Sequence, residues 1–256
     1  MTTMPHHIIL DGIISIQACI QSKSRPIHTV YIGTQKQSRK IDCFLNVLEE
    51  NSIHVQCVPP DFIKQLSAGK TNGGIVATAG KRVFQSAETI FDSMATPHFY
   101  VLLEGIEDPF NVGYCIRSLY ALGVNGLFLS ARDWGAAESI IVRASAGASE
   151  YMPICLYNDA AELASTARFR NIDIVCADAT DKAIDLYETQ FSAPMLLVIG
   201  GEKRGIAMDF LSTASTVVKI PYAREFRYSL PAASATSILA YEVMRQLRQR
   251  DAVREV

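Results

Sequence analysis

The stretch Phe99-Tyr-Val-Leu-Leu-Glu-Gly-Ile-Glu-Asp108-Pro109-Phe-Asn111-Val-Gly113 decides the fold of this chain. It begins as an apolar run that is typical of a strand buried on both faces of a parallel sheet. A polar loop follows, and the spacing predicts a helix from about Val112 to Leu122 that Gly123 closes. A buried strand that enters a helix through a polar loop favours an α/β fold.

The rest of this half of the chain repeats the pattern of apolar runs separated by helical segments. The further predicted strands are Leu127–Ser130, Ile172–Ala177, Met195–Gly200 and Val217–Ile220, and a final helix is expected from about Ala232 to Arg250. This alternation predicts a mostly parallel sheet. Loops at its carboxyl edge would meet where open α/β sheets bind their ligands.

The first 80 residues predict a separate small αβα unit. It is expected to contain a helix near Gly12, strands at His28–Gly33, Ile53–Val58 and Ile75–Thr78, a helix at Ile41–Glu50, and a short helix at Asp61–Leu66 capped by Asp61. A polar linker is expected near residues 80–97. We therefore predict two domains, residues 1–84 and residues 97–256.

Charge is unevenly divided between these two predicted domains. Residues 1–82 hold nine Lys and Arg against five acids, a balance of +4, so the remainder sums to −6 because the whole chain carries −2. A positive module on an acidic body suits a protein that gathers phosphate with one part and does chemistry with another. An ordinary solvated surface would give the same balance.

Composition is that of an ordinary globular protein, with 49% hydrophobic and 20% charged residues in 256. No apolar stretch reaches the roughly 18 residues of a membrane span, and no targeting pattern opens the chain, so we expect a cytoplasmic protein without a membrane partner. The six cysteines lack CxxC or Cys/His ligand spacing. We expect them to be reduced core residues, and we expect no metal.

Three separated motifs carry a resemblance to a known family. They are Asp108-Pro109-x-Asn111-x-Gly113-x3-Arg117, then Gly200-x-Glu202-x2-Gly205, and then Ile220-Pro221 followed by Ser229-Leu230. In this order they resemble the SpoU (TrmH) branch of the SPOUT superfamily of RNA methyltransferases, over about residues 98–250. The region before them is similar to the ribosomal-protein-like RNA-binding domain that often precedes the catalytic domain in that family.

The resemblance implies a fold and a cofactor. The fold is α/β, with a C-terminal SPOUT-type knotted domain on a mostly parallel sheet, preceded by the small αβα RNA-binding domain. The cofactor is S-adenosylmethionine, and the positions implied to hold it are Gly200, Gly201, Ile220, Leu230 and Ala232. The glycines have a plainer reading as a tight turn. The resemblance also implies a homodimer formed through the final helix.

The candidates for catalysis of methyl transfer to a ribose 2′-hydroxyl, which must be aligned and helped to lose its proton, are Asn111, Arg117, Glu202 and Ser229. Arg117 is expected to hold RNA phosphate and to stabilise alkoxide charge, or else to be a solvated helix residue. Asn111 would bond the ribose or cap the helix before Val112. Glu202 would orient Arg117 or the target nucleotide, or be an exposed turn acid.

The third motif departs from the family pattern, which continues Ser-Leu-Asn where this chain has Pro231. Proline has no side-chain amide and no N–H donor, so the missing function must come from Ser229 or Ser234, or be absent. The plainer reading is that Pro231 begins the final helix. The preceding loop is bulkier than is usual in the family, and its residues Arg224, Phe226, Arg227 and Tyr228 suit RNA contact or a dimer interface equally.

The preferred function is that of a homodimeric RNA 2′-O-ribose methyltransferase whose substrate is rRNA rather than tRNA. The preference for rRNA depends only on the N-terminal domain. Three alternatives stay open: a catalytically impaired RNA-binding protein on the same fold, which Pro231 motivates, a tRNA-directed enzyme, and a methyltransferase for small molecules or proteins.

Overall fold

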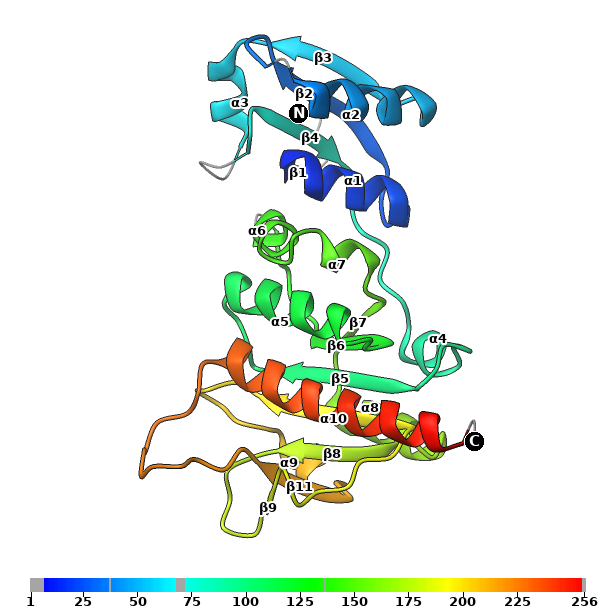
Figure 1. Ribbon diagram of the computed structural model, residues 1–256, viewed down its shortest axis with the longest axis vertical. Coiled ribbons are helices and arrows are strands. Elements are labelled where there is room, and N and C mark those ends of the chain that lie inside the picture. The colour runs from blue at the N-terminus through cyan, green and yellow to red at the C-terminus, as the bar shows by residue number, and fades with distance from the viewer. Residues whose placement is uncertain (1–6, 37, 68–71, 136, 255–256) are drawn as a thin grey trace. The chain divides into compact units, whose positions relative to one another are not determined.

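The computed structural model describes residues 7–36, 38–67, 72–135 and 137–254, which fall into two compact units (Figure 1). Unit 1 contains the chain up to Val83 together with Trp134–Tyr151. Unit 2 contains Phe84–Asp133 and the chain from Met152 onward. Unit 1 is therefore assembled from two separate stretches of sequence.

Unit 1 is built on a mixed four-stranded sheet in the order β1-β4-β2-β3, in which only β2 and β3 are parallel. Its core includes Leu10, Ile16, Val30 and Phe44. The elements are β1 (Ile8–Asp11), α1 (Gly12–Ser22), β2 (Ile27–Gly33), α2 (Arg39–Glu50), β3 (His54–Val58), α3 (Pro60–Leu66), β4 (Ile75–Ala79), α6 (Ala137–Ala144) and α7 (Ala148–Tyr151).

Most of the predicted elements of unit 1 are confirmed, with two corrections. Strand β1 has no counterpart in the prediction, because it is only four residues long, too short for a clear periodic pattern. Asp61 is not the cap of α3, since Pro60 already lies in the first turn and Pro59 occupies the cap position. Proline is favoured at a first helical position because its missing N–H needs no partner there.

Buried charges hold the two stretches of unit 1 together. The guanidinium of Arg25 donates two hydrogen bonds of 3.0 Å to Glu150, and both side chains are fully buried. Arg25 also lies 2.6 Å from Glu138, and the hydroxyl of Ser24 donates to Glu150. Removing one partner of such a pair leaves an uncompensated buried charge. Helices α6 and α7 are thus fixed to the N-terminal stretch by electrostatics as well as by Val142 in its core.

Unit 2 contains an all-parallel seven-stranded sheet in the order β7-β6-β5-β10-β8-β11-β9. The predicted α/β class with its two sheets is confirmed, and the knot that the resemblance implies stays a prediction. The elements are α4 (Ala87–Phe91), β5 (Phe99–Glu104), α5 (Pro109–Ala121), β6 (Gly126–Ser130), β7 (Ile154–Tyr157), α8 (Ala160–Phe169), β8 (Asp173–Ala177), β9 (Ile184–Asp185), β10 (Met195–Gly200), α9 (Met208–Leu211), β11 (Thr216–Lys219) and α10 (Ala232–Arg254).

The predicted strands of unit 2 are confirmed within a residue or so, and the differences concern short or capped elements. The helix α4 lies inside the predicted linker, where Ser86 caps it by accepting from the Thr89 N–H at 3.2 Å. Strands β7 and β9 are also additional, and they are too short for a clear periodic pattern.

Two predicted helix boundaries can be compared with the structure. Helix α5 begins at Pro109, because the Asp108 carboxylate accepts from the Asn111 N–H at 2.8 Å, so the reading of Asn111 as the cap is wrong. The Pro231 carbonyl accepts the first hydrogen bonds of α10, from Ser234 and Ala235. Pro231 therefore lies at the start of the final helix, directly before its first residue, Ala232.

The cysteines divide into buried and exposed groups, and all six are free. Cys19, Cys115, Cys155 and Cys176 are buried, as predicted, and burial raises the pKa of Cys115 to about 11. Cys43 and Cys57 are exposed, so the prediction of a core position is wrong for these two. Cys43 lies on the outward face of α2, and Cys57 lies on the edge strand β3.

Among the described residues, no helix is long and apolar enough to cross a membrane.

Candidate functional site

A cavity of about 780 Å³ lies at the carboxyl edge of the parallel sheet in unit 2. Its walls are the turn Gly200–Ile206 after β10, the loop Pro221–Leu230 after β11, and the start of α10. We call it the loop pocket. Seven of the nine predicted site residues line it, and Asn111 and Arg117 are the exceptions. The seven are Gly200, Gly201, Glu202, Ile220, Ser229, Leu230 and Ala232. The turn, the loop and the start of α10, which follow different elements in the sequence, therefore form one site.

The turn is held by backbone packing that leaves no room for side chains at two glycines. Gly201 donates to the Glu104 carbonyl at 2.6 Å, and Gly205 donates back to the Gly201 carbonyl at 3.0 Å. A Cβ on Gly201 would lie 2.4 Å from the Gly105 oxygen, and one on Gly200 would lie 2.7 Å from the Gly205 carbonyl carbon. Gly205 has φ +65°, which favours glycine for a different reason. The tight-turn reading of these glycines is thus correct as far as their own packing is concerned.

Glu104 joins the turn to the neighbouring strand ends, and the sequence motifs do not include it. Its carboxylate accepts from the Ala207 N–H at 3.3 Å and from the hydroxyl of Tyr157, to which Ser130 donates at 3.0 Å. Burial is the main cause that raises the pKa of Glu104. The only available signal was an acidic residue at the end of a buried strand. Glu104 therefore fixes both ends of the turn, one through its carbonyl and one through its side chain.

The opposite wall, the loop Pro221–Leu230, is made of exposed side chains. One hydrogen bond closes it, from the Leu230 N–H to the Tyr222 hydroxyl at 3.0 Å. The side chains of Arg224, Phe226 and Tyr228 are exposed and line the pocket. This wall is polar and aromatic, whereas the floor is apolar.

The acidic groups of the loop pocket come from three places. Glu202 is exposed in the turn. Asp178 and Asp185, which sequence reasoning missed, lie at the ends of β8 and β9, and Asp185 is 3.8 Å from the Lys219 ammonium. Asp178 directly follows a predicted apolar strand, which was the signal that could have found it. No cluster of three or more His, Cys, Asp or Glu in the described parts of the chain is placed to hold a metal ion.

Asn111 and Arg117 lie apart from this pocket. Both belong to α5, and neither lines the cavity. Arg117 is exposed, and Asn111 is half-buried in the first turn. The structure of one chain therefore brings the cofactor positions together with Glu202 and Ser229, but not with the motif-one residues.

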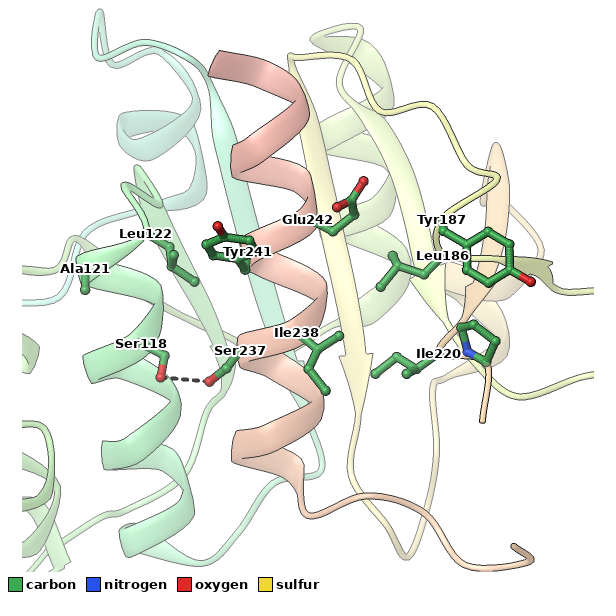
Figure 2. A pocket seen from close by; sticks show the side chains of 11 residues that line it. Ser118, Ala121, Leu122, Leu186, Tyr187, Ile220, Ser237, Ile238, Tyr241 and Glu242 are labelled. Atoms are coloured by element: carbon green, nitrogen blue, oxygen red, sulfur yellow. Dashed lines mark hydrogen bonds between the residues drawn. The ribbon is translucent and has the colours of Figure 1, made fainter. Parts of the chain in front are cut away.

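A second, apolar hollow of about 740 Å³ lies along α10, and we call it the helix-face pocket (Figure 2). Helices α5 and α10 lie side by side there, joined by a 2.8 Å hydrogen bond between Ser237 and Ser118. Leu186, Tyr187 and Ile220 form its other side. Tyr241 is 56% exposed, Tyr187 is 68% exposed and Ile238 is 41% exposed. This face therefore presents a large apolar surface to solvent.

Two protein-family matches cover the parts of the chain that contain the two sheets. Residues 98–241 match the SpoU rRNA methylase family, and residues 9–83 match the family described as RNA 2′-O ribose methyltransferase substrate binding. The 23S rRNA (guanosine-2′-O-)-methyltransferase RlmB of Yersinia pestis is 26% identical over 241 residues, covering 93% of this chain and 97% of that protein. RlmB of Ralstonia nicotianae is 23% identical over 239 residues, covering 93% of this chain and 95% of that protein.

A solved structure shows the same fold. The SpoU methyltransferase AviRb from Streptomyces viridochromogenes, in complex with the cofactor AdoMet, superposes with a TM-score of 0.78 at 24% identity, covering 96% of this chain and 92% of that one. The motifs, the parallel sheet and the family match agree. The chain belongs to the SpoU rRNA methylase family.

Proposed function

We propose that the loop pocket binds S-adenosylmethionine and that the chain, an RNA 2′-O-ribose methyltransferase, transfers the methyl group to a ribose of rRNA. The observation that carries the proposal is the loop pocket itself, where the second and third motifs meet. The related AviRb structure, solved with AdoMet, supports the cofactor, and the RlmB relatives support the rRNA substrate.

The residues of the loop pocket fit this cofactor. Its volume of about 780 Å³ is in the range of small-molecule sites, roughly 300–1,000 Å³. Ile199, Ile206 and Leu239 are buried and give an apolar floor for an adenine ring. Asp178 offers a carboxylate for ribose hydroxyls. Because Tyr222 already takes the Leu230 N–H, the Leu230 carbonyl is the group we assign to the cofactor.

The bound cofactor supplies an activated methyl group, and the chain must position and activate the hydroxyl that receives it. We assign Glu202 and Ser229, which are exposed and line the pocket, to the orientation of the target ribose. Arg117 has the chemistry to hold a phosphate and to stabilise alkoxide charge as the proton leaves. We assign Asn111 to the ribose as well.

A homodimer accounts for the position of Arg117. The helix-face pocket and the exposed rings of Tyr187 and Tyr241 form a surface that a second copy would bury. Arg117 is exposed on α5, beside this face, and does not line the pocket of its own chain. We therefore propose that each chain supplies Arg117 to the loop pocket of its partner.

Division of labour between the domains completes the proposal. We assign RNA binding to residues 1–84, whose predicted domain has a positive balance, and catalysis to residues 97–256. The match of residues 9–83 to a substrate-binding family supports this assignment. Both proposed substrates favour a cytoplasmic protein.

The experiment is methyl transfer from tritiated S-adenosylmethionine to rRNA and, separately, to tRNA. We expect label in rRNA and at least tenfold less in tRNA. Cofactor and RNA binding without turnover would instead support the impaired protein that Pro231 motivates. Failure to bind the cofactor would overturn the enzyme reading.

Mixed dimers test the exchange of Arg117. Arg117→Ala and Glu202→Ala should each lower the rate by about 10² or more. If Arg117 acts on the partner's pocket, a mixed dimer of the two variants keeps one complete site, so random mixing should restore about a quarter of wild-type activity. No restoration, with mixed dimers verified by mass, would contradict the exchange.

A further inference from the structure

The loop Pro221–Leu230 exposes three aromatic side chains. Tyr222 is 41% exposed, Phe226 is 56% exposed and Tyr228 is 60% exposed. Large apolar side chains gathered in one exposed patch mark a binding surface more often than scattered ones do. These three aromatic side chains are therefore not explained by packing in the core of the protein, and they mark a candidate binding surface.

The rings are arranged in a row. The centroids of Tyr222 and Phe226 are 6.3 Å apart, and those of Phe226 and Tyr228 are 5.5 Å apart at 62°. The Tyr222 hydroxyl also accepts the Leu230 N–H, which fixes the first ring of the row to the far end of the loop. The aromatic patch is thus preformed.

Two guanidinium groups accompany the rings. The Arg227 Cζ lies 5.3 Å from the centroid of Tyr228. Arg224 is on the same loop, and neither arginine forms an ion pair with a carboxylate in the described parts of the chain. Unpaired guanidinium groups beside exposed rings have the chemistry to bind phosphate and to stack on bases.

The patch is placed beside the chemistry. The three rings and both arginines line the loop pocket, whose other wall contains Glu202. An unpaired nucleotide that offers its ribose to this pocket would therefore lie within the same cavity as the rings. Its neighbours in the strand would have aromatic faces on which to stack.

We propose that Tyr222, Phe226 and Tyr228, with Arg224 and Arg227, form a stacking platform for unpaired RNA bases next to the methylated ribose. Single-stranded RNA is recognised mainly by stacking on aromatic and guanidinium planes, whereas a duplex keeps its bases inside. The platform thus selects a looped or unpaired target. This inference rests on the proposed function, because it places the target nucleotide at the loop pocket.

The test uses the full-length protein and two RNA probes, a fluorescein-labelled single-stranded 12-mer of uridine and a blunt duplex of the same length. Phe226→Ala and Tyr228→Ala should each weaken binding of the single strand about tenfold, in line with the loss of one stacked base. Phe226→Trp, which keeps a ring, should stay within about threefold of the wild type. Duplex binding should be unchanged.

The matched control is Phe169→Ala, because Phe169 is 86% exposed in the same unit but outside the loop. It should leave binding of both probes unchanged. Affinity for S-adenosylmethionine and the mass of the dimer should also be unchanged in the loop variants. The KM for rRNA in methyl transfer should rise about tenfold.

Three results would overturn the platform. They are unchanged single-strand binding in both alanine variants, an equal loss for the duplex, and a loss of cofactor affinity or dimer mass that matches the loss of RNA binding. The proposed function fails differently, through a wild-type protein that does not bind S-adenosylmethionine or methylate rRNA. The RNA-binding measurements report on the platform in either case.

Discussion

The two walls of the loop pocket differ in how they are held, and the difference separates their roles. The turn Gly200–Ile206 is fixed by main-chain hydrogen bonds and by contacts too close for any side chain at Gly201. The loop Pro221–Leu230 is closed by one hydrogen bond and presents exposed rings and arginines. A wall of fixed main chain suits a cofactor, which has the same chemical structure in every reaction. A wall of exposed side chains suits an RNA target, whose sequence and structure are particular to this enzyme.

The largest expected effect comes from breaking the turn. Gly201→Ala would place a Cβ 2.4 Å from the Gly105 oxygen, where main chain cannot easily yield, so cofactor affinity should fall more than about 100-fold. Gly205→Ala is the matched control, because its Cβ meets nothing within 4 Å and only the positive φ opposes it, at a cost of about 1–2 kcal/mol. Calorimetric titration with S-adenosylmethionine should separate the two variants. Equal losses would mean that backbone packing does not set the cofactor site.

A smaller effect should follow from removing the support of the turn. Glu104→Ala leaves the Ala207 N–H without its side-chain acceptor, a loss of about 1–3 kcal/mol, so the Kd for the cofactor should rise about tenfold. Glu104→Gln keeps an acceptor oxygen and should recover most of the affinity. The kcat at saturating cofactor should change little in either variant. A Gln variant as weak as the Ala variant would show that charge, and not the hydrogen bond, matters.

Loss of the hydrogen bond between the Leu230 N–H and the Tyr222 hydroxyl should speed amide exchange in the loop and leave amide exchange in the turn unchanged. Tyr222→Phe removes the acceptor of the Leu230 N–H, worth about 0.5–1.5 kcal/mol, so the Leu230 amide should exchange with deuterium about tenfold faster. The Gly201 and Gly205 amides should keep their wild-type protection. Loop and turn amides that exchange equally fast in the wild type would abolish the distinction between the walls.

The smallest expected effect is on the pH dependence of stability. Burial raises the pKa of Glu104, so the folded state disfavours its ionised form. Stability from this group is present at low pH and is lost as pH rises above the ordinary value of 4.5. Glu104→Gln should therefore raise the free energy of unfolding at pH 7, by less than about 1 kcal/mol because solvent screens the half-exposed group. This gain in stability should vanish near pH 4, where the wild-type carboxyl is protonated. A gain that grows on acidification would contradict the direction of the shift.

The sequence predicts the turn and loop because their causes are local. Glycines directly after the buried run Met195–Gly200 indicate a tight turn, and Ile220-Pro221 marks the start of the loop. The role of Glu104 was not predictable in this way. Its side-chain partner at the turn, Ala207, is 103 residues away, and an acid at a strand end is common.

The sequence did not predict that helices α6 and α7 belong to unit 1, because the contacts that hold them there also join residues far apart in sequence. Helices α6 and α7 join unit 1 through the pair of Arg25 and Glu150, which are 125 residues apart. Their own sequence has the helical spacing of any connection in an α/β domain. Only the fold reveals that their charged residues meet a buried arginine.

The most direct measurement is the chemical position of the transferred methyl group. Tritiated S-adenosylmethionine and rRNA are incubated with the protein, and the RNA is then hydrolysed in alkali, which cleaves beside a free 2′-hydroxyl but not beside a methylated one. We predict that the label appears in alkali-resistant dinucleotides and disappears with Gly201→Ala. Label in alkali-sensitive mononucleotides, or none at all, would contradict ribose methylation at the loop pocket.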